Sequence, residues 1–397
     1  MTDKTMPALR FRGFYDAWEQ RKLGELTNSF EYGLNASAKK FDGIHKYIRI
    51  TDIDDSSRKF NSDSITSPDI NFSSADNYEL KQNDLLFART GASVGKSYIY
   101  TESDGLVYYA GFLIRVRIKP EFDSNFVFQN TFTSSYENFI RITSQRSGQP
   151  GVNSKEYASF EISIPSLEEQ QMIGSLFKQL DNLTAQNERK IDLLKQLKQA
   201  YLQKIFSQEL RFAGFNDDWE ERKIVDLFEE RSERSPHGQM ISITMGSGVV
   251  LASSLDRKDN SSFDKSNYKV VRKNDIAYNS MRMWQGASGV SPYNGIVSPA
   301  YTIITPKDNV DSGFFAIQFK MAKSLKTFQK YSQGLTSDTW NLKYPALSSI
   351  PMITPNFTEQ KKINHFFGIF DDLIDKYEKK VLLLKRKKRS YLQKMFV

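Results

Sequence analysis

The segment from Arg89 to Tyr100, RTGASVGKSYIY, contains the residue types of a phosphate-binding loop. Such a loop needs a glycine, four residues and then Gly-Lys-Ser or Gly-Lys-Thr, so that backbone N–H groups surround the phosphates. Gly95, Lys96 and Ser97 fit this pattern, but Thr90 occupies the position of the first glycine. The residues SYIY that follow favour a strand, whereas the motif requires the N-terminus of a helix. The spacing therefore argues against a nucleotide site.

Other patterns with catalytic potential are weaker still. PD at 68–69 and ELK at 79–81 have the acids and lysine with which a nuclease holds Mg²⁺, but this pattern is short and often arises by chance. The Asn/Asp-Pro-Pro-aromatic signature of DNA amino-methyltransferases is absent, because the chain has no Pro-Pro pair. The three histidines, His45, His237 and His365, lack the spacing of metal ligands or of a nucleophile and its base. We expect no catalytic residue, no metal and no cofactor.

Composition narrows the class of protein. The chain has 397 residues, enough for two or three domains, and its 39% hydrophobic content is sufficient for packed cores. The absence of cysteine excludes disulfides and thiolate metal sites. The beginning, MTDKTMPALR, has no signal-peptide pattern, and no apolar run reaches membrane-spanning length. We expect a cytoplasmic protein with no membrane contact, and the net charge of +8 favours an acidic partner such as nucleic acid.

The chain contains two copies of one plan. KQAYLQKIF, ending at Phe206, recurs as KRSYLQKMF, ending 190 positions later. RFRGFYDAWEQRKLGEL, from Arg10, recurs 201 positions later as RFAGFNDDWEERKIVDL. The sequence between these anchors diverges. Each half thus has an RF-x-GF segment, a variable module and a helix, which is typical of one scaffold that presents two different binding surfaces.

The variable modules are predicted to be rich in strands. YIRITDID, DLLFART, SYIY and FLIRVRI in the first module, and MISITMG, DIAYNSM and YTIITP in the second, cluster β-forming residues between turn residues. Each module ends at a proline, Pro165 or Pro355, just before a predicted helix. Ser166 and Thr358 are the expected N-caps of these helices.

Both predicted helices have a sustained 4-3 spacing, which is typical of a coiled-coil seam. The seam positions of the first helix are Ile173, Phe177, Leu180, Thr184, Asn187, Ile191, Leu194, Lys198, Tyr201 and Ile205. Those of the second are Ile363, Phe367, Phe370, Ile374, Tyr377, Val381, Leu384, Lys388, Tyr391 and Met395. An RF-x-GF segment follows the first helix and also opens the chain, as if it followed the second. The repeat is therefore circular if the termini meet, and the two helices then run antiparallel; two independent helical hairpins are the alternative.

The order and doubling of these motifs identify a family. Two variable modules, each followed by a P-x-x-x-E-Q helix start and a Y-L-Q-K helix end, resemble the specificity subunit of a type I restriction–modification system over nearly the whole chain. The resemblance implies α/β (α+β) recognition domains in tandem, joined by two long antiparallel coiled-coil helices in a pseudo-two-fold repeat. It further implies double-stranded DNA, two methyltransferase subunits and restriction subunits as partners, with each domain reading one half of an asymmetric bipartite target.

The resemblance places DNA-binding residues in a loop after the N-D-L/I strand of each module, and a second loop in each is chosen for its mixture of polar side chains and glycines, without exact equivalence between the modules. In the first module we expect contacts from Arg89, Thr90, Ser93 and Lys96, and from a second loop, 145–157, through Arg146, Gln149 and Asn153. In the second module the corresponding residues are Asn279, Arg282, Trp284, Gln285 and Ser288, and, in loop 331–343, Gln333, Ser337 and Trp340. Arginine and lysine donate to guanine or to phosphate, while small hydroxyl side chains let the backbone approach the duplex. For each of these residues, ordinary solvated turn chemistry is the alternative.

The expected domain order is a first target-recognition domain (1–165), a central spacer helix (166–208), a second target-recognition domain (209–355) and a C-terminal spacer helix (356–397). The predicted protein is a non-catalytic DNA-recognition subunit. The rival hypothesis is a coiled-coil adaptor whose modules bind proteins, and salt-sensitive DNA binding would separate the two.

Overall fold

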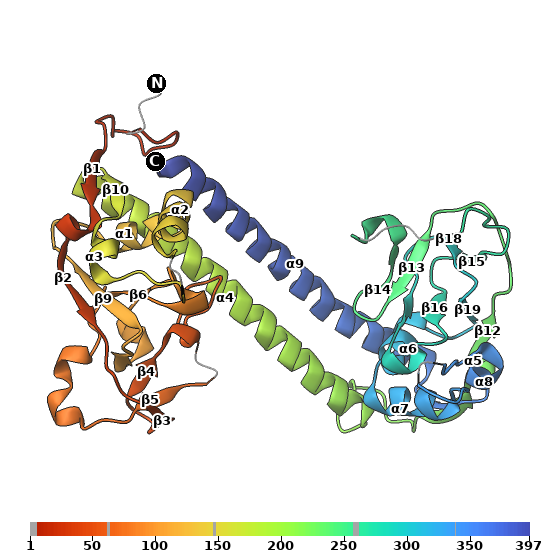
Figure 1. The fold of residues 1–397 in the computed structure, drawn as a ribbon. Coiled ribbons are helices and arrows are strands. Elements are labelled where there is room, and N and C mark those ends of the chain that lie inside the picture. The colour runs from red at the N-terminus through yellow and green to blue at the C-terminus, as the bar shows by residue number, and fades with distance from the viewer. Residues whose placement is uncertain (1–5, 62–63, 146–147, 257–261, 338) are drawn as a thin grey trace. The chain divides into compact units, whose positions relative to one another are not determined.

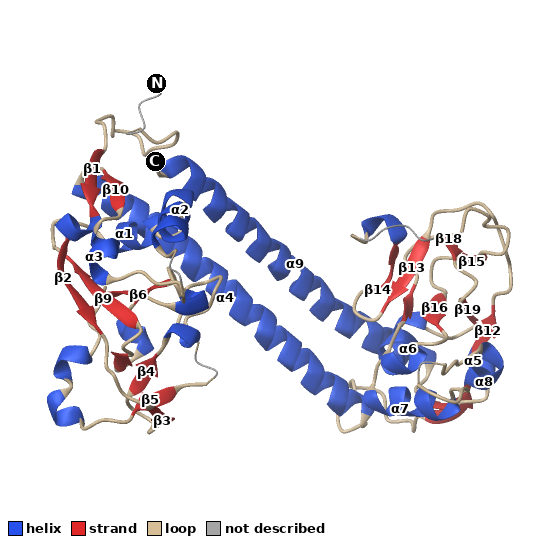
Figure 2. Cartoon of the chain, viewed as in Figure 1, coloured by secondary structure: helices blue, strands red, loops and turns tan. Residues whose placement is uncertain are grey.

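The computed structural model describes residues 6–61, 64–145, 148–256, 262–337 and 339–397. The chain divides into two compact units: Met1–Lys190 with Tyr377–Val397, and Ile191–Lys376. Two long helices, α4 (Leu167–Phe206) and α9 (Phe357–Met395), each contribute residues to both units. Figure 1 colours the chain by residue number, and Figure 2 separates its helices from its strands.

Unit 1 is built on a four-stranded antiparallel sheet in the order β2-β9-β6-β7. A second sheet has the order β3-β5-β4-β8, and β1 pairs with β10. The strands are β1 (Glu19–Lys22), β2 (Thr27–Tyr32), β3 (Ala38–Lys40), β4 (Lys46–Ile48), β5 (Thr66–Pro68), β6 (Leu85–Ala88), β7 (Ser97–Ile99), β8 (Val107–Tyr109), β9 (Leu113–Ile118) and β10 (Glu161–Ile164). Short helices α1 (Ser124–Asn130), α2 (Ser134–Thr143) and α3 (Ser154–Ala158) precede α4.

Unit 2 repeats the main sheet in the order β12-β19-β16-β17 and the outer pair as β11 with β20. The smaller sheet differs, because β13 pairs with β14 and β15 with β18 in two separate ribbons. The strands are β11 (Glu220–Lys223), β12 (Phe228–Glu230), β13 (Ile241–Thr244), β14 (Gly248–Leu251), β15 (Lys269–Val271), β16 (Ile276–Asn279), β17 (Ser288–Val290), β18 (Gly295–Val297), β19 (Tyr301–Pro306) and β20 (Pro351–Thr354). The helices are α5 (Ile224–Leu227), α6 (Ser312–Phe319), α7 (Ala322–Tyr331) and α8 (Tyr344–Ser348), followed by α9.

Most predicted strands form, but the segment YIRITDID does not remain extended. Strand β4 ends at Ile48, and a 3-10 turn follows at Ile50–Asp52. The buried carboxylate of Asp52 accepts hydrogen bonds from the backbone N–H and the guanidinium of Arg49, at 3.0 and 2.8 Å. This side-chain bonding replaces ladder bonds, which propensity alone does not predict.

The helix starts explain the E-Q motif. Arg10 donates two hydrogen bonds to the fully buried carboxylate of Glu169, at 3.0 and 2.7 Å. Arg211 does the same for Glu359, at 3.1 and 2.7 Å. The glutamine that follows each glutamate accepts a hydrogen bond from the backbone N–H of an N-cap residue: Gln170 from Asp123, which caps α1, and Gln360 from Asp311, which caps α6. The motif therefore ties each RF-x-GF segment and each module to the start of a long helix.

One predicted N-cap is correct in position and the other is wrong. Ser166 precedes α4, and its Oγ lies 3.4 Å from the backbone nitrogen of Glu169. For α9 the cap is Asn356, whose side-chain oxygen accepts from the backbone N–H of Glu359 at 3.0 Å. Thr358 lies inside the first turn instead. Asn356 stands 190 positions after Ser166, so the 190-residue repeat relates the two N-caps.

Within each unit the two long helices run antiparallel. In unit 1, Lys388 pairs with Asp181 at 2.7 Å and Lys385 pairs with Glu188 at 2.8 Å, so residue numbers rise on α4 as they fall on α9. In unit 2, Lys198 pairs with Asp371 at 2.5 Å. Every predicted seam position is buried or half-buried in its own unit. The antiparallel prediction is confirmed, and the independent hairpins are excluded.

The circular character of the repeat is also visible unit by unit. In unit 1 the backbone N–H of Leu9 donates to the carbonyl of Lys394 at 2.8 Å. In unit 2 the N–H of Leu210 donates to the carbonyl of Lys204 at 3.0 Å. The first bond joins distant parts of the sequence and the second joins neighbours. The opening segment thus docks on the end of α9 as residue 210 docks on the end of α4.

Candidate nucleic-acid interface

Two loops of unit 1 lie side by side at the end of β6. The backbone N–H of Gly91 donates to the carbonyl of Pro150, and the N–H of Val152 donates to the carbonyl of Arg89, both at 2.9 Å. Gly91 has a φ of +70°, and a Cβ there would stand 2.9 Å from the side-chain nitrogen of Gln149. A glycine is therefore required where the second loop crosses the first. The structure brings the two predicted loops of this module together.

A buried tyrosine supports the first loop from below. The hydroxyl of Tyr157 donates to the carbonyl of Ala88 at 2.7 Å and accepts from the N–H of Gly95 at 3.2 Å. Burial raises the pKa of Tyr157 well above its ordinary value, so the phenol keeps its proton as a donor. Ser97 begins strand β7 at the end of this loop, as the sequence predicted, rather than a helix. The loop is a supported turn between two strands.

The predicted side chains of unit 1 differ in what they do. Arg89 stacks over the ring of Tyr32, with its guanidinium carbon 4.9 Å from the ring centroid. Lys96 is engaged in an ion pair with Asp55 at 2.5 Å, and only 15% of its side chain is exposed. Asn153 caps α3 by accepting from the N–H of Glu156 at 3.0 Å. Thr90 and Ser93 are half-buried and Gln149 is exposed, while Arg146 lies outside the described residues.

Unit 2 joins its two predicted loops with an equivalent bond. The N–H of Leu342 donates to the carbonyl of Ser280 at 2.8 Å, as Val152 does to Arg89 in unit 1. The indoles of Trp284 and Trp340, one from each loop, meet edge to face with centroids 5.2 Å apart. Two half-buried indoles at this position give the second interface an aromatic centre where unit 1 has an arginine on a tyrosine.

The remaining predicted residues of unit 2 are mostly at the surface. Arg282 is exposed and donates to the side-chain oxygen of Gln285 at 3.1 Å, which holds the pair together. The side-chain oxygen of Asn279 accepts from the N–H of Met281 at 3.0 Å. Gln333 and Ser337 are exposed in the second loop.

Ser288 does not belong to this surface. Its side chain is fully buried in β17, where it pairs with Tyr278 in the same register as Ser97 with Phe87 in unit 1. The sequence alignment of the loops at 190 positions hid this equivalence, since the strands that flank the loops are related by 191 positions. We therefore leave Ser288 out of the interface.

Tyr32 and Asp55 were not predicted from the sequence, although both contact predicted residues. Tyr32 ends β2, and Asp55 lies in the turn after Asp52. Neither residue lies in a loop that the repeat relates between the halves, so no sequence signal pointed to them. Tyr32 reaches the end of β6 only because β2 pairs with β9 and β9 pairs with β6.

A buried carboxylate on a matched turn precedes the strand that leads to each interface. Asn83 and Asn274 have φ of 71° and 74°, and the aspartates that follow them, Asp84 and Asp275, are buried. Asp84 accepts from Arg117 at 3.0 Å, and Asp275 accepts from Arg231 at 2.7 Å. The hydrogen bond to Asp275 holds the pKa of Arg231 above its ordinary value. The Asn-Asp echo in the sequence is thus the turn that begins β6 and β16.

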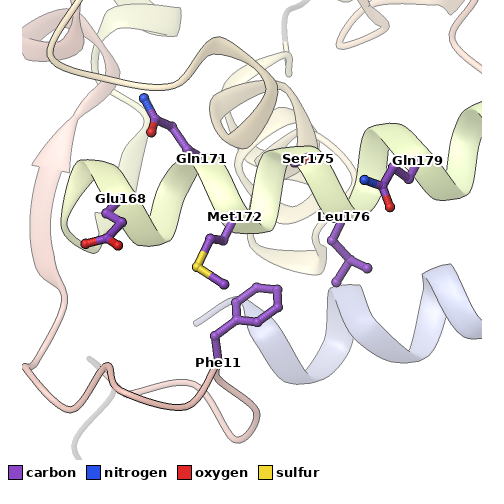
Figure 3. Close-up of a pocket in the computed structure, with 7 residues that line it drawn as sticks. All are labelled: Phe11, Glu168, Gln171, Met172, Ser175, Leu176 and Gln179. Carbon is purple, nitrogen blue, oxygen red and sulfur yellow. The ribbon is translucent and has the colours of Figure 1, made fainter.

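An open groove on unit 1 lies on the helical part rather than on the loops. Figure 3 shows Phe11 of the RF-x-GF segment against Met172 and Leu176 of α4. Glu168, Gln171, Ser175 and Gln179 complete its lining. In unit 2, Phe366 stands at the position equivalent to Leu176 and packs against Phe212 at 5.5 Å between centroids. The groove therefore marks a difference in side-chain size between the halves.

Asp69 and Glu79 of the nuclease-like pattern contact basic residues of the fold. Asp69 pairs with Lys39 at 3.5 Å, and the backbone carbonyl of Glu79 accepts from Arg115 at 3.0 Å. Across the described ranges no group of three or more His, Asp or Glu side chains is placed to hold a metal ion. In the same ranges, no helix has both the length and the apolar character needed to cross a membrane.

Comparison with known proteins agrees with this architecture. A family model described as "Type I restriction modification DNA specificity domain" matches residues 15–196 and again 216–385. The proposed MjaX specificity subunit of a type I restriction enzyme from Methanocaldococcus jannaschii is 23% identical over 95% of this chain and 90% of its own length. The MjaVIII specificity subunit from the same organism is 21% identical over 79% of this chain and 76% of its own length.

A solved structure shares the fold. The type I restriction–modification S subunit from M. genitalium superposes with a TM-score of 0.68 and 17% identity, covering 98% of this chain and 99% of that one. Two units of one plan, each with its own pair of loops, define a tandem recognition scaffold. The chain belongs to the family of type I restriction–modification DNA specificity subunits.

Proposed function

We propose that this chain reads an asymmetric bipartite DNA sequence, one half with residues 1–165 and the other with residues 209–355. The observation that supports the proposal is the joining of two loops by an equivalent backbone bond in each unit, Val152 to Arg89 and Leu342 to Ser280, around unlike side chains. Matched frames with unlike contact residues suit two half-sites of different sequence. The net charge of +8 suits a polyanionic ligand.

The contacts within this proposal come from both loops of each unit. Unit 1 contributes Arg89, Thr90, Ser93, Lys96, Gln149 and Asn153, and unit 2 contributes Asn279, Arg282, Trp284, Gln285, Gln333, Ser337 and Trp340. Arg146 stays in the proposal on sequence grounds alone. Lys96 reaches DNA only if phosphate replaces Asp55 as its partner, because its ammonium is already paired.

The chain itself supplies recognition and no catalysis in this proposal. Two methyltransferase subunits and restriction subunits supply the chemistry. The spacer segments 166–208 and 356–397, which contain α4 and α9, fix the gap between the half-sites and dock the methyltransferase subunits. A rigid spacer raises the effective concentration of the second module once the first has bound. The cytoplasm, where chromosomal DNA lies, is the proposed location.

The test is to co-express the chain with its cognate methyltransferase subunit in a host free of DNA methylation. Single-molecule sequencing of the host genome then reports every methylated adenine. We expect one bipartite, asymmetric motif with a fixed gap, and exchange of residues 209–355 for those of a relative should change one half-site only. An assembled complex that leaves the genome unmodified contradicts the proposal and favours the protein-binding adaptor.

A further inference from the structure

The guanidinium of Arg89 rests on an aromatic platform that is itself anchored. Its carbon lies 4.9 Å from the centroid of the Tyr32 ring, which is 41% exposed. The hydroxyl of Tyr32 donates to the Oγ of Ser154 at 3.1 Å and accepts from the backbone N–H of Ser154 at 3.2 Å. Ser154 is the first residue of α3, so the ring is fixed at one end by β2 and at the other by a helix start.

The backbone of Arg89 is fixed as well. Its N–H donates to the carbonyl of Phe112 at 3.0 Å, and its carbonyl accepts from the N–H of Val152 at 2.9 Å. Within the described part of the chain, no carboxylate lies within ion-pair distance of the Arg89 guanidinium, whereas neighbouring cations such as Lys96 and Arg117 are paired. Lys96, the other basic residue of this loop, is already neutralised by Asp55. Arg89 is thus a half-buried cation with both its main chain and its plane held, and no carboxylate among the described residues pairs with its N–H edge.

At the two equivalent positions of unit 2, the described residues do not form such a platform. The bond from Leu342 to Ser280 places Ser280 where unit 1 has Arg89, and that serine is buried and donates to the carbonyl of Ala300. Strand β12 ends at Glu230, opposite Ile304, and two more residues in the same register reach Ser232 where unit 1 has Tyr32. Both members of the pair are serines in unit 2. The feature therefore distinguishes the two modules rather than supporting their common frame.

A guanidinium stacked on a ring keeps its N–H edge available in the plane of the stack. Two acceptors in one plane, O6 and N7 of guanine in the major groove, match that edge. We propose that Tyr32 is a positioning residue that orients Arg89 to read one guanine in the half-site recognised by unit 1. This inference rests on the proposed DNA-reading function and adds a base and a residue to it.

The experiment uses the complex of the chain with its cognate methyltransferase subunit and the genome-wide motif described above. The half-site that survives exchange of residues 209–355 belongs to unit 1. In that half-site, Arg89→Ala and Tyr32→Leu should relax one guanine position and leave the other half-site unchanged. Tyr32→Phe, which keeps the ring, should retain that guanine. Arg21→Ala removes an exposed arginine of unit 1 that pairs with Glu19 and serves as the matched control.

Binding measurements identify the atom that is read. Duplexes with 7-deazaguanine at that position lack the N7 acceptor and should bind the unaltered complex about tenfold more weakly. The Arg89→Ala complex should bind both duplexes equally, because the donor is already missing. The inference is overturned if the unit 1 half-site contains no guanine that depends on Arg89. It is equally overturned if Arg89→Ala weakens all sequences alike and lowers the salt dependence, since that identifies a phosphate contact. A bipartite motif from the unaltered complex still upholds the proposed function in both cases, whereas no motif overturns function and inference together.

Discussion

Glu169 and Glu359 are fully buried carboxylates, and each depends on one arginine from an RF-x-GF segment. Both arginines also donate to a backbone carbonyl six residues further on, Asp16 for Arg10 and Asp217 for Arg211. A buried charge costs far more alone than when it is paired. At the scale of single residues, the doubling of the motif thus reflects one electrostatic requirement that the chain meets twice.

Substitution of Arg10 should therefore destabilise unit 1. Arg10→Met leaves Glu169 buried without a partner, and we expect the free energy of unfolding to fall by about 3 kcal/mol. Urea denaturation measures the change. Arg21→Met, which removes a partner of the exposed Glu19, should cost far less. Equal losses for the two variants contradict a special role for the buried pair, and Glu169→Gln added to Arg10→Met should recover part of the stability.

A second residue-scale prediction concerns the polar seam position Asn187. Its side chain is buried, its amide nitrogen donates to the carbonyl of Leu183, and its oxygen has no hydrogen-bond partner among the residues that the structure describes. A buried unsatisfied oxygen is unfavourable, and a polar residue in a seam exchanges stability for a defined register. Asn187→Leu should therefore raise the free energy of unfolding by about 1 kcal/mol. Thermal denaturation of the Asn187→Leu variant measures the change. A lower stability than that of the unaltered protein would mean that the amide contributes more than its single local hydrogen bond indicates.

At the scale of elements, the long helices form reciprocal ion pairs through lysines at equivalent seam positions. Lys388 with Asp181 and Lys198 with Asp371 exchange roles across the 190-residue repeat. The surroundings differ, because Lys388 also lies over the ring of Phe132, 4.2 Å from its centroid, and burial lowers its pKa. Asp371 is 62% exposed, whereas Asp181 is 28% exposed. The lysine that breaks the apolar seam is thus matched in both units, but its aspartate partner is well exposed only in unit 2.

Double-mutant cycles should reveal that difference. We expect the coupling energy of Lys388 with Asp181 to reach about 1 kcal/mol or more, and that of Lys198 with Asp371 to be a few tenths, about 0.3 kcal/mol. The measurement compares the stability of each single Ala variant with that of the double variant. Exchanging the charges of the buried pair, Lys388→Asp with Asp181→Lys, should restore part of the loss. A larger coupling for the exposed pair contradicts the assignment of burial as the cause.

At the scale of the whole molecule, each unit closes on the end of a long helix with an equivalent backbone bond. The bond from Leu9 to Lys394 in unit 1 corresponds to the bond from Leu210 to Lys204 in unit 2, where the chain is continuous. The turn after α4 contains Gln208 with a φ of +64° and passes through exposed residues. Such a turn tolerates a break, because few buried contacts depend on its continuity.

A circular permutant follows from this equivalence. Joining residue 397 to residue 1 and opening the chain between Ser207 and Gln208 should give a protein that folds and supports methylation of the same bipartite motif. The stability should change by no more than about 1–2 kcal/mol, since one loop closure replaces another. Opening the chain within β9 instead serves as the negative control. A soluble permutant that loses the motif would show that the continuity of the natural turn is needed.

The sequence by itself determined much of this architecture. The 3.5-residue spacing fixed both long helices and their seams, because a helix buries residues at that period wherever it forms. The doubled motifs indicated the two units and their family. The positions of the RF-x-GF segments favoured antiparallel helices over independent hairpins, and the ion pairs between the helices confirmed that pairing. Local chemistry is enough for such features, since neighbours three and four positions apart meet on one helix face.

The tertiary structure decided what depends on residues far apart in the chain. It removed Ser288 from the surface, because strand register buries alternate side chains and the strands follow an offset of 191 positions. It showed that Asn356 rather than Thr358 caps α9, and that Lys96 forms an ion pair with Asp55. It also brought Tyr32 under Arg89, from strands 57 positions apart in the sequence. Side-chain pairing of this kind follows from sheet order and register, which no local pattern of residues encodes.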